Sequence, residues 1–273
     1  MPKLESQPFE SKLDTSSEQF NKNKTSMLSM LEEIDVLLDE AELGGGEHHK
    51  ERLAKRGKLP VRERVFHFLD PDSPFLEISV LAAYKSDYPV GGGAIAGIGV
   101  SAGIECIIFA NDPTVLAGAM HFYSVKKWMR AMQIARDSRL PFIQFVESAG
   151  GDLRPRSNAV VGGTTHFAES GRQFYEITEL SKLNIPTVTV TFGTATAGGA
   201  YQPGMSDYNI FVKDQADVAL AGPPLVQMAT GEISSREDIG GAKMHAEKSG
   251  LAEYLADNDL DGIRTVSYTH LTL

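Results

Sequence analysis

The chain contains 273 residues, of which 42% are hydrophobic and 23% are charged, and its formal net charge is −10. Such a composition is typical of a globular protein with a substantial core, and the acidic balance argues against a nucleic-acid-binding surface or a general role at a membrane surface. Cys106 is the only cysteine and has apolar neighbours, which excludes an internal disulfide or a cysteine-based zinc cluster and predicts a buried, inert thiol. We expect no metal site and no membrane span, and the absence of a recognisable targeting signal favours a cytoplasmic protein.

The N-terminal part of the sequence predicts helices. Residues 1–24 are polar and are expected to form a frayed tail, whereas apolar residues recur at helical spacing from 26 to 43 and predict an amphipathic helix that ends at Gly44. The charged segment 47–70 predicts one further helix. Its basic residues have two interpretations, a solvated helix face and a docking surface for a phosphate-bearing ligand, and they are His48, His49, Lys50, Arg52, Lys55, Arg56 and Lys58.

The rest of the sequence repeats a strand, a turn of small residues and a helix. Residues 91–100 and 103–112 predict a β-hairpin whose second strand ends at Asn111. This order favours an α/β architecture with crossover connections, in which ligand-binding turns lie along one edge of the sheet. The later predicted elements are a helix containing Lys126, Lys127 and Arg130, strands at 140–148, 185–192 and 208–212, and a helix at about 165–183.

Two of the predicted strands run into paired glycines, in ESAGG at residues 147–151 and in GTATAGGAY at residues 193–201. One interpretation is tight turning and close packing of strand against helix. The other is that backbone N–H groups, freed of side chains, approach a ligand oxygen and stabilise developing negative charge. The sequence leaves both interpretations open.

Other motifs with known chemistry do not fit. The segment from Gly97 to Ala102 resembles a dinucleotide fingerprint but lies inside the predicted hairpin, and Lys58 is not followed by the serine or threonine of a phosphate-binding loop. His48 and His49 are adjacent, so they diverge on a helix. Lys243 is not preceded by the methionine of a biotin-attachment site. With these motifs excluded, the two glycine-rich strand ends favour chemistry in which oriented backbone dipoles act on an acyl or carbonyl substrate.

Several long segments, in order, resemble the carboxyltransferase (β) subunit of biotin-dependent acyl-CoA carboxylases, whose halves have the crotonase fold of repeated ββα units. The resemblance covers residues 44–264, and its opening is similar to the methylcrotonyl and geranyl branch. The matching segments are RGKLPVRERVFHFLDPDSPFLEIS, ANDPTVLAGA, SVKKWMRAMQIA, LPFIQFVESAGGDL, GTATAGGAYQPGMSDYNIFV and LAGPPLVQMATGEISSREDIGGAKMHAEKSGLAEYLADND.

The resemblance implies an α/β, crotonase-like enzyme that moves a carboxyl group from carboxybiotin to an acyl-CoA through an enolate. Biotin is then carried by a biotin carboxylase or carboxyl carrier partner, coenzyme A is part of the substrate, and the protein is a homo-oligomer. Backbone amides at Ala149 and Gly150 are expected to stabilise the enolate oxygen. The implied substrate-binding residues are Ser148, Gly151, Ala197, Gly198, Gly199, Ala200 and Tyr201.

The sequence departs from the family at two places. Glu147-Ser-Ala-Gly-Gly stands where the family usually has Asp-Ser-Gly-Gly-Ala, which leaves open which two amides face the oxygen. Family members have two crotonase-like halves, and this sequence matches the first. We expect residues 1–43 to be a polar tail and helix, 44–264 to be the carboxyltransferase domain, and 265–273 to be a non-family tail of artefactual origin, which makes the chain incomplete and prone to self-association.

Two alternatives are of other classes. The first is a stand-alone crotonase-fold hydratase, isomerase or decarboxylase, for which Glu147 is the one candidate carboxylate beside the turn. The second is a non-catalytic half that binds coenzyme A or a partner subunit. A residue placed like Asp152, next to the turn, is more often a helix cap than a catalytic base. No motif of the sequence encodes the length of the acyl chain.

Overall fold

The computed structural model describes residues 10–152, 154 and 167–269, and the chain divides into a unit of residues 1–39 and a unit of residues 40–273. Helix α1 (Glu18–Leu43) ends where the sequence predicted, but it begins earlier, so the prediction of a tail at residues 18–24 was wrong. The missed signal is Ser17, whose hydroxyl accepts a hydrogen bond from the Phe20 N–H at 3.2 Å and so caps the first turn.

The charged segment forms two short helices instead of one. Helix α2 covers Glu47–Ala54 and helix α3 covers Val61–Phe68. The chain turns between them at Gly57, which has a φ of +70°, and Pro60 directly precedes α3. Since proline is favoured at a helix start and glycine beyond a helix end, GKLP is a break that the sequence already contained.

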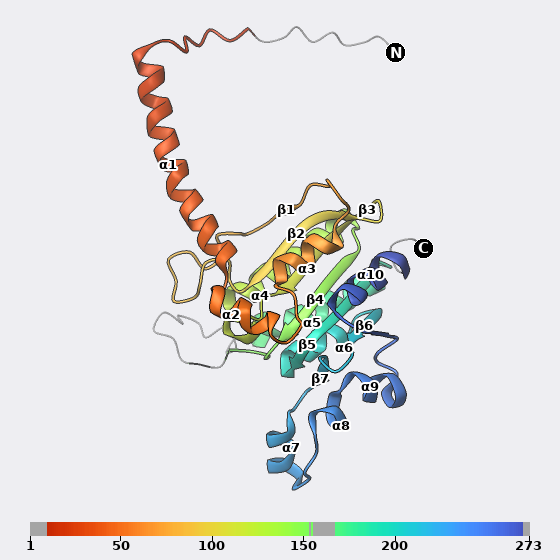
Figure 1. Cartoon of the computed structure of the whole chain (residues 1–273). Coiled ribbons are helices and arrows are strands. Elements are labelled where there is room, and N and C mark those ends of the chain that lie inside the picture. The colour runs from red at the N-terminus through yellow and green to blue at the C-terminus, as the bar shows by residue number, and fades with distance from the viewer. Residues whose placement is uncertain (1–9, 153, 155–166, 270–273) are drawn as a thin grey trace, which may run out of the picture. The chain divides into compact units, whose positions relative to one another are not determined.

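An eight-stranded sheet forms the centre of the second unit, in the order β1-β2-β3-β4-β5-β6-β8, with β7 paired to the end of β5 (Figure 1). The β2–β3 hairpin is confirmed, and β4 and β5 are parallel neighbours as expected. The pairs β1–β2 and β2–β3 are antiparallel and the others are parallel. The strands are β1 (Leu76–Glu77), β2 (Ala94–Ser101), β3 (Ile104–Asn111), β4 (Phe142–Ser148), β5 (Thr187–Thr196), β6 (Tyr208–Val212), β7 (Asp217–Ala219) and β8 (Tyr254–Ala256).

Strand β5 is longer than the sequence predicted. Its last residues, Thr194 to Thr196, pair with β7, a short strand that sequence analysis had not identified. Therefore the GTAT segment belongs to the strand, and the second glycine-rich turn begins at Ala197.

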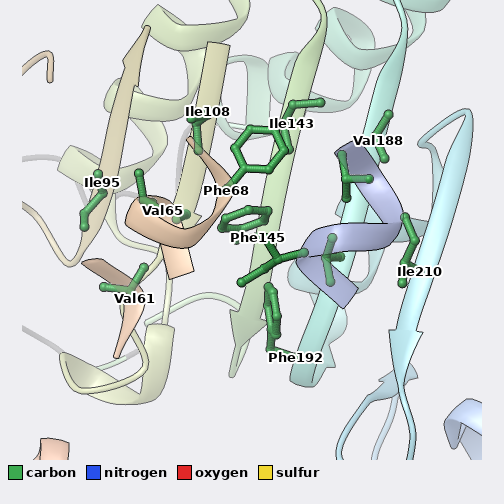
Figure 2. Packing of buried hydrophobic residues seen from close by; sticks show 14 of the residues in the cluster. Val61, Val65, Phe68, Ile95, Ile108, Ile143, Phe145, Val188, Phe192 and Ile210 are labelled. Carbon is green, nitrogen blue, oxygen red and sulfur yellow. The ribbon is translucent and has the colours of Figure 1, made fainter. Parts of the chain in front are cut away.

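Helices cover both faces of the sheet. On one face, α3 and α10 (Asp259–Thr269) pack on the strands, and Figure 2 shows Phe68 of α3 beside Phe145 of β4. On the other face lie α4 (Phe122–Ser138) and α5 (Phe167–Lys182), with Trp128 buried in a second core. The central strands are therefore buried on both faces. The face toward α3 is apolar, whereas the face toward α4 includes the buried polar residues Gln144 and Thr189, and Trp128 donates a hydrogen bond to Gln144 at 3.0 Å.

The remaining elements follow β3, β5 and β7. Cys106 lies in β3 and is fully buried, which raises the pKa of its thiol to about 12, with a smaller contribution from the charge of Asp70.

Among the helices that the structure describes, none has both the length and the apolar character needed to cross a bilayer. The elements are η1 (Leu116–Gly118), η2 (Ala197–Ala200), α6 (Tyr201–Gly204), α7 (Pro223–Thr230), α8 (Arg236–Gly240), α9 (Ala242–Met244) and the π-helical turn η3 (His245–Ser249).

Candidate functional site

The two glycine-rich turns lie side by side at the carboxyl ends of β4 and β5. Ser148 pairs with Ala195 across the two strands. A Cβ atom on Gly150 would come within 2.7 Å of the Thr196 carbonyl oxygen, and one on Gly199 within 3.1 Å of the Ser148 side chain. The turns are in close contact, with the Thr196 backbone at Gly150 and with the Ser148 side chain at Gly199, which is why glycine occupies both positions. The predicted proximity of the two turns is confirmed.

The strands become irregular just before these turns. Val146 of β4 pairs with Thr191 of β5, whereas Ser148 pairs with Ala195, so β5 carries two extra residues opposite Glu147. Such bulges re-aim the residues that follow them and are common beside active sites. The bulge therefore sets the direction in which both strands leave the sheet.

A third segment, which the sequence analysis did not place in the site, packs on the first turn. The Ala149 N–H donates to the Ala117 carbonyl at 3.1 Å, and the Met120 N–H donates to the Gly150 carbonyl at 2.7 Å. Gly118 lies against the Glu147 carbonyl with no room for a side chain. The signal for this segment was available, because LAGAM also follows a strand, β3, and consists largely of small residues.

The two amides expected to stabilise the enolate oxygen, those of Ala149 and Gly150, both have hydrogen-bond partners within the protein. Ala149 donates to the Ala117 carbonyl, while the Gly150 N–H donates to the Ser148 hydroxyl at 3.2 Å. Gly150 is buried with a φ of +90°, and Ala149 and Gly151 are exposed. The Gly150 amide thus has a hydroxyl partner that can rotate away, whereas the Ala149 amide has a fixed backbone partner.

The second turn is helical. Ala197 has a φ of +53° and opens the 3₁₀ turn η2, in which Gly199 and Ala200 are buried and Gly198 is partly exposed. Tyr201 begins α6 and is 39% exposed, with its ring centroid 4.5 Å from that of Phe174. Tyr201 therefore lies at the surface beside α5.

A cleft of about 510 Å³ opens beside the first turn. It reaches β5 at Thr194, and within the described residues the implied substrate-binding residues 197–201 are not part of its lining. Three arginines and a histidine line it together with backbone of the first and third segments. The lining residues are His49, Arg52, Leu53, Arg56, Pro113, Thr114, Leu116, Ala117, Glu147, Ala149, Thr194 and Arg236.

The basic cluster of the sequence is divided by the fold. Arg52 and Arg56 of the α2 region are exposed on the cleft wall, and in the described part of the chain neither forms an ion pair. Lys58, by contrast, is buried. Arg236, which the sequence analysis missed, reaches the cleft from α8 and is held by Thr194 at 3.1 Å and by Asp217 at 2.8 Å.

A buried ion-pair network lies directly behind the first turn. Lys58 Nζ is 2.6 Å from Glu147 Oε1, and Arg64 Nη2 is 3.1 Å from Glu147 Oε2. Arg64 Nε is 2.9 Å from Asp259 Oδ2, which also accepts the Leu59 N–H at 3.0 Å. Because both Glu147 oxygens are engaged by cations, this carboxylate is not available as a base.

Arg64 had a signal in the sequence that the analysis did not use. Val61, Val65 and Phe68 form the buried stripe of α3, and Arg64 occupies the same stripe, one turn after Val61. A charge on a buried helix face requires a buried partner.

Among the described residues, no group of three or more histidine, cysteine or acidic side chains could hold a metal ion.

Comparison with known proteins adds to this geometry. Residues 52–270 match the family described as the carboxyl transferase domain. The chain is 46% identical over 256 residues to a probable biotin-dependent acyl-coenzyme A carboxylase beta2 subunit of Mycobacterium tuberculosis, a match that covers 94% of this chain and 47% of that protein. It is 45% identical to the biotin-dependent 3-methylcrotonyl-coenzyme A carboxylase beta1 subunit of the same organism, over 87% of this chain and 44% of that protein.

Solved structures agree. The geranyl-CoA carboxylase beta subunit of P. aeruginosa superposes with a TM-score of 0.86 at 40% identity, over 97% of this chain and 48% of the other. The transcarboxylase 12S structure with methylmalonyl-coenzyme A bound gives a TM-score of 0.79 at 25% identity, over 88% of this chain and 47% of the other. The predicted crotonase-like fold is confirmed, and the chain spans about half the length of the relatives it matches.

Proposed function

Because the chain belongs to the carboxyl transferase domain family, we propose that it is the acyl-CoA-binding part of a carboxyltransferase in a biotin-dependent acyl-CoA carboxylase. The observation that carries the proposal is the cleft that is lined both by exposed arginines and by Glu147 and Ala149 of the ESAGG turn. The proposed partners are a biotin-bearing carboxylase or carrier subunit and further copies of the chain. The proposed acyl-CoA is of the methylcrotonyl or geranyl class, named in the 3-methylcrotonyl and geranyl relatives.

The arginines of the cleft provide the charge that the phosphates of coenzyme A need. Arg52 and Arg56 have guanidinium groups without an ion-pair partner in the described part of the chain, and Arg236 is oriented by Asp217. A guanidinium group matches phosphate oxygens in a bidentate geometry. The interpretation of this part of the basic cluster as a phosphate-docking surface is therefore the one we adopt.

The backbone of the first turn supplies the group that stabilises negative charge on the thioester oxygen. Carboxybiotin on the partner protein supplies the carboxyl group. We assign the donor role to Gly150, which is buried next to the cleft-lining Ala149 and whose N–H is bonded to the rotatable Ser148 hydroxyl. Ala149 is not assigned as a donor because its own N–H is bonded to Ala117. Gly151, Ala197, Gly198, Gly199, Ala200 and Tyr201 remain assigned to the surroundings of the acyl group.

The hydratase alternative is not favoured. A hydratase needs a carboxylate that gains and loses a proton in contact with substrate. Glu147, the candidate, is held by Lys58 at 2.6 Å and by Arg64 at 3.1 Å. Its charge is thus committed to an internal network.

The test is a carboxyl-transfer assay. The chain in its native assembly with the biotin-bearing partner is given bicarbonate, ATP and 3-methylcrotonyl-, geranyl- or propionyl-CoA, so that carboxybiotin forms on the partner, and the acyl-CoA products are identified by mass spectrometry. We expect a carboxylated acyl-CoA. Hydrated or isomerised products would support the stand-alone enzyme, and binding without any product would support the non-catalytic half.

Charge removal in the cleft tests the substrate site. Arg52→Gln and Arg56→Gln should each raise the KM for acyl-CoA about tenfold, the effect of losing one hydrogen bond to a charged group, and should change kcat little. Lys55→Gln is the matched control, since Lys55 is exposed near the same helix but does not line the cleft. An unchanged KM in both arginine variants would contradict the assignment.

A further inference from the structure

The position of the buried ion-pair network behind the first turn is not explained by a contribution to stability. Its members come from the segment between α2 and α3 (Lys58), from α3 (Arg64), from β4 (Glu147) and from the start of α10 (Asp259). Two cations and two anions give no net charge. Arg64 and Asp259 are almost completely buried, with exposures of 0% and 2%.

The network is incompletely satisfied. Arg64 Nη1 and Asp259 Oδ1 are buried and, among the described residues, have no hydrogen-bond partner. Removing such charges from water is unfavourable, and a buried ion pair of this kind is weak grounds for stability. Apolar side chains of similar size would serve a purely structural role equally well, so the position of the network is the property to explain.

That position is the bulge between β4 and β5. Glu147 is the residue at which the register shifts. A Cβ atom on Gly193 would lie 2.6 Å from the Glu147 carboxylate and 2.7 Å from Lys58 Nζ, so the extra residues of β5 wrap around this ion pair. The Arg64 guanidinium lies 4.3 Å above the Phe192 ring, next to Gly193 in β5. The network thus touches both strands at the point where they leave the sheet.

We infer that Lys58 and Glu147 are positioning residues that fix the bulge and, through it, the spacing of the two glycine-rich turns. The inference rests on the proposed function for its effect on carboxyl transfer. Glu147 precedes Ser148 and Gly150, and Gly193 precedes Thr196 and Ala197, so a shift at the bulge moves both turns. The same cations neutralise Glu147, the one carboxylate among the described residues that line the cleft, which would otherwise oppose the charge developing on the substrate.

The test separates positioning from stability. Lys58→Met and Glu147→Leu each leave an unpaired charge in the network and should lower the free energy of unfolding. The double variant removes both members of the pair and leaves Arg64 with Asp259, so the free energy of unfolding should recover. If the pair positions the turns, the double variant should still show about 100-fold lower kcat, the effect of a misplacement of about 1 Å. The KM for acyl-CoA should change less than about twofold, and amide hydrogen exchange at residues 149–151 and 193–199 should be about tenfold faster.

Two controls complete the design. Glu179→Leu with Lys182→Met removes an exposed ion pair by the same substitutions and should leave exchange and kcat unchanged. Lys58→Arg keeps a cation facing Glu147, so it should retain most of the exchange protection that Lys58→Met loses. Both variants keep the pair between Arg64 and Glu147, so they differ only in the cation at position 58. This comparison decides the matter even if the double variant does not fold.

The outcomes are distinct for the two proposals. Exchange and kcat like those of the exposed-pair control would overturn the positioning role, as would equal exchange in Lys58→Met and Lys58→Arg. An assembly of the unaltered chain that transfers no carboxyl group would instead contradict the proposed function, while the exchange measurements on the same chain would still decide whether the network holds the turns.

Discussion

Residues 149–151 and 197–199 follow neighbouring parallel strands and consist of the same small residues, yet their backbones are built differently. The first turn is extended and hydrogen-bonds to a third segment through Ala117 and Met120. The second winds directly into the 3₁₀ turn η2. Glycine is accordingly required for local reasons, at Gly150 by positive φ and close backbone and at Gly199 by the adjoining Ser148, but at Gly198 by neither. Paired glycines in a sequence therefore do not indicate equivalent positions.

A side chain at Gly150 should have the largest effect. In Gly150→Ala the new Cβ lies 2.7 Å from the Thr196 carbonyl oxygen at a φ of +90°. Left-handed backbone and overpacking together should lower the free energy of unfolding by about 2–5 kcal/mol, measured by urea denaturation. Gly150→Val should do more, because its larger, branched side chain strikes the second turn. A loss below about 1 kcal/mol would show that the turns are not locked together.

A third glycine run, Gly91 to Gly93, differs from both turns because a lysine side chain hydrogen-bonds to backbone carbonyls at its two ends. Lys127 Nζ donates to the carbonyls of Gly91 at 3.3 Å and Ala94 at 2.7 Å. Burial lowers the pKa of Lys127 from its ordinary 10.5 to about 8, with the charge of Glu77 opposing this shift and that of Arg62 adding to it.

This shift predicts a pH dependence. Below about pH 8 the buried charge opposes folding, and between pH 8 and 10.5 the folded chain has lost a proton that the unfolded chain retains. Stability relative to Lys127→Met should therefore rise with pH by up to about 3 kcal/mol across this range. Unfolding titrations of both proteins at several pH values measure the difference, and a difference that stays flat would mean that Lys127 is not desolvated.

Gly199→Ala should have a smaller effect. Its Cβ would lie 3.1 Å from the Ser148 side chain, which has to shift by a few tenths of an ångström. We expect a loss of about 1–2 kcal/mol in the free energy of unfolding. A cycle with Ser148→Gly provides the check, because removing the Ser148 side chain should relieve most of this loss. Simple additivity of the two changes would argue against contact between the turns.

Gly198→Ala should have the smallest effect of the series. The atom nearest to an added Cβ is Met120 Cε at 4.0 Å, an ordinary contact. The free energy of unfolding should change by no more than about 0.5 kcal/mol, as calorimetry or urea denaturation can establish. If Gly198→Ala were as damaging as Gly150→Ala, the contrast between the two turns would be lost.

The sequence predicted the sheet and the meeting of the two turns, because apolar runs such as 140–148 report buried strands and parallel neighbours end at one edge. It did not predict which amides of the first turn are engaged, since the bond from Ala149 to Ala117 joins segments whose approach depends on the packing of η1 on β4. The division of the basic cluster was also hidden. Lys58 and Arg56 are two residues apart in one charged run, and only the turn at Gly57 and Pro60 sends one into the interior and the other into the cleft.

The hydrogen bond from the Leu59 N–H to Asp259 also affects the order of events during synthesis, because its partners are 200 residues apart in the chain. At about 5–20 residues per second, a ribosome needs on the order of 10–40 s to add the second after the first. Arg64 lacks both of its carboxylates until Glu147 is added, and it lacks Asp259 for the rest of that interval. The α3 helix therefore cannot settle on the nascent sheet with its final charge balance, and a chain arrested before α10 exposes this face to chaperones and proteases.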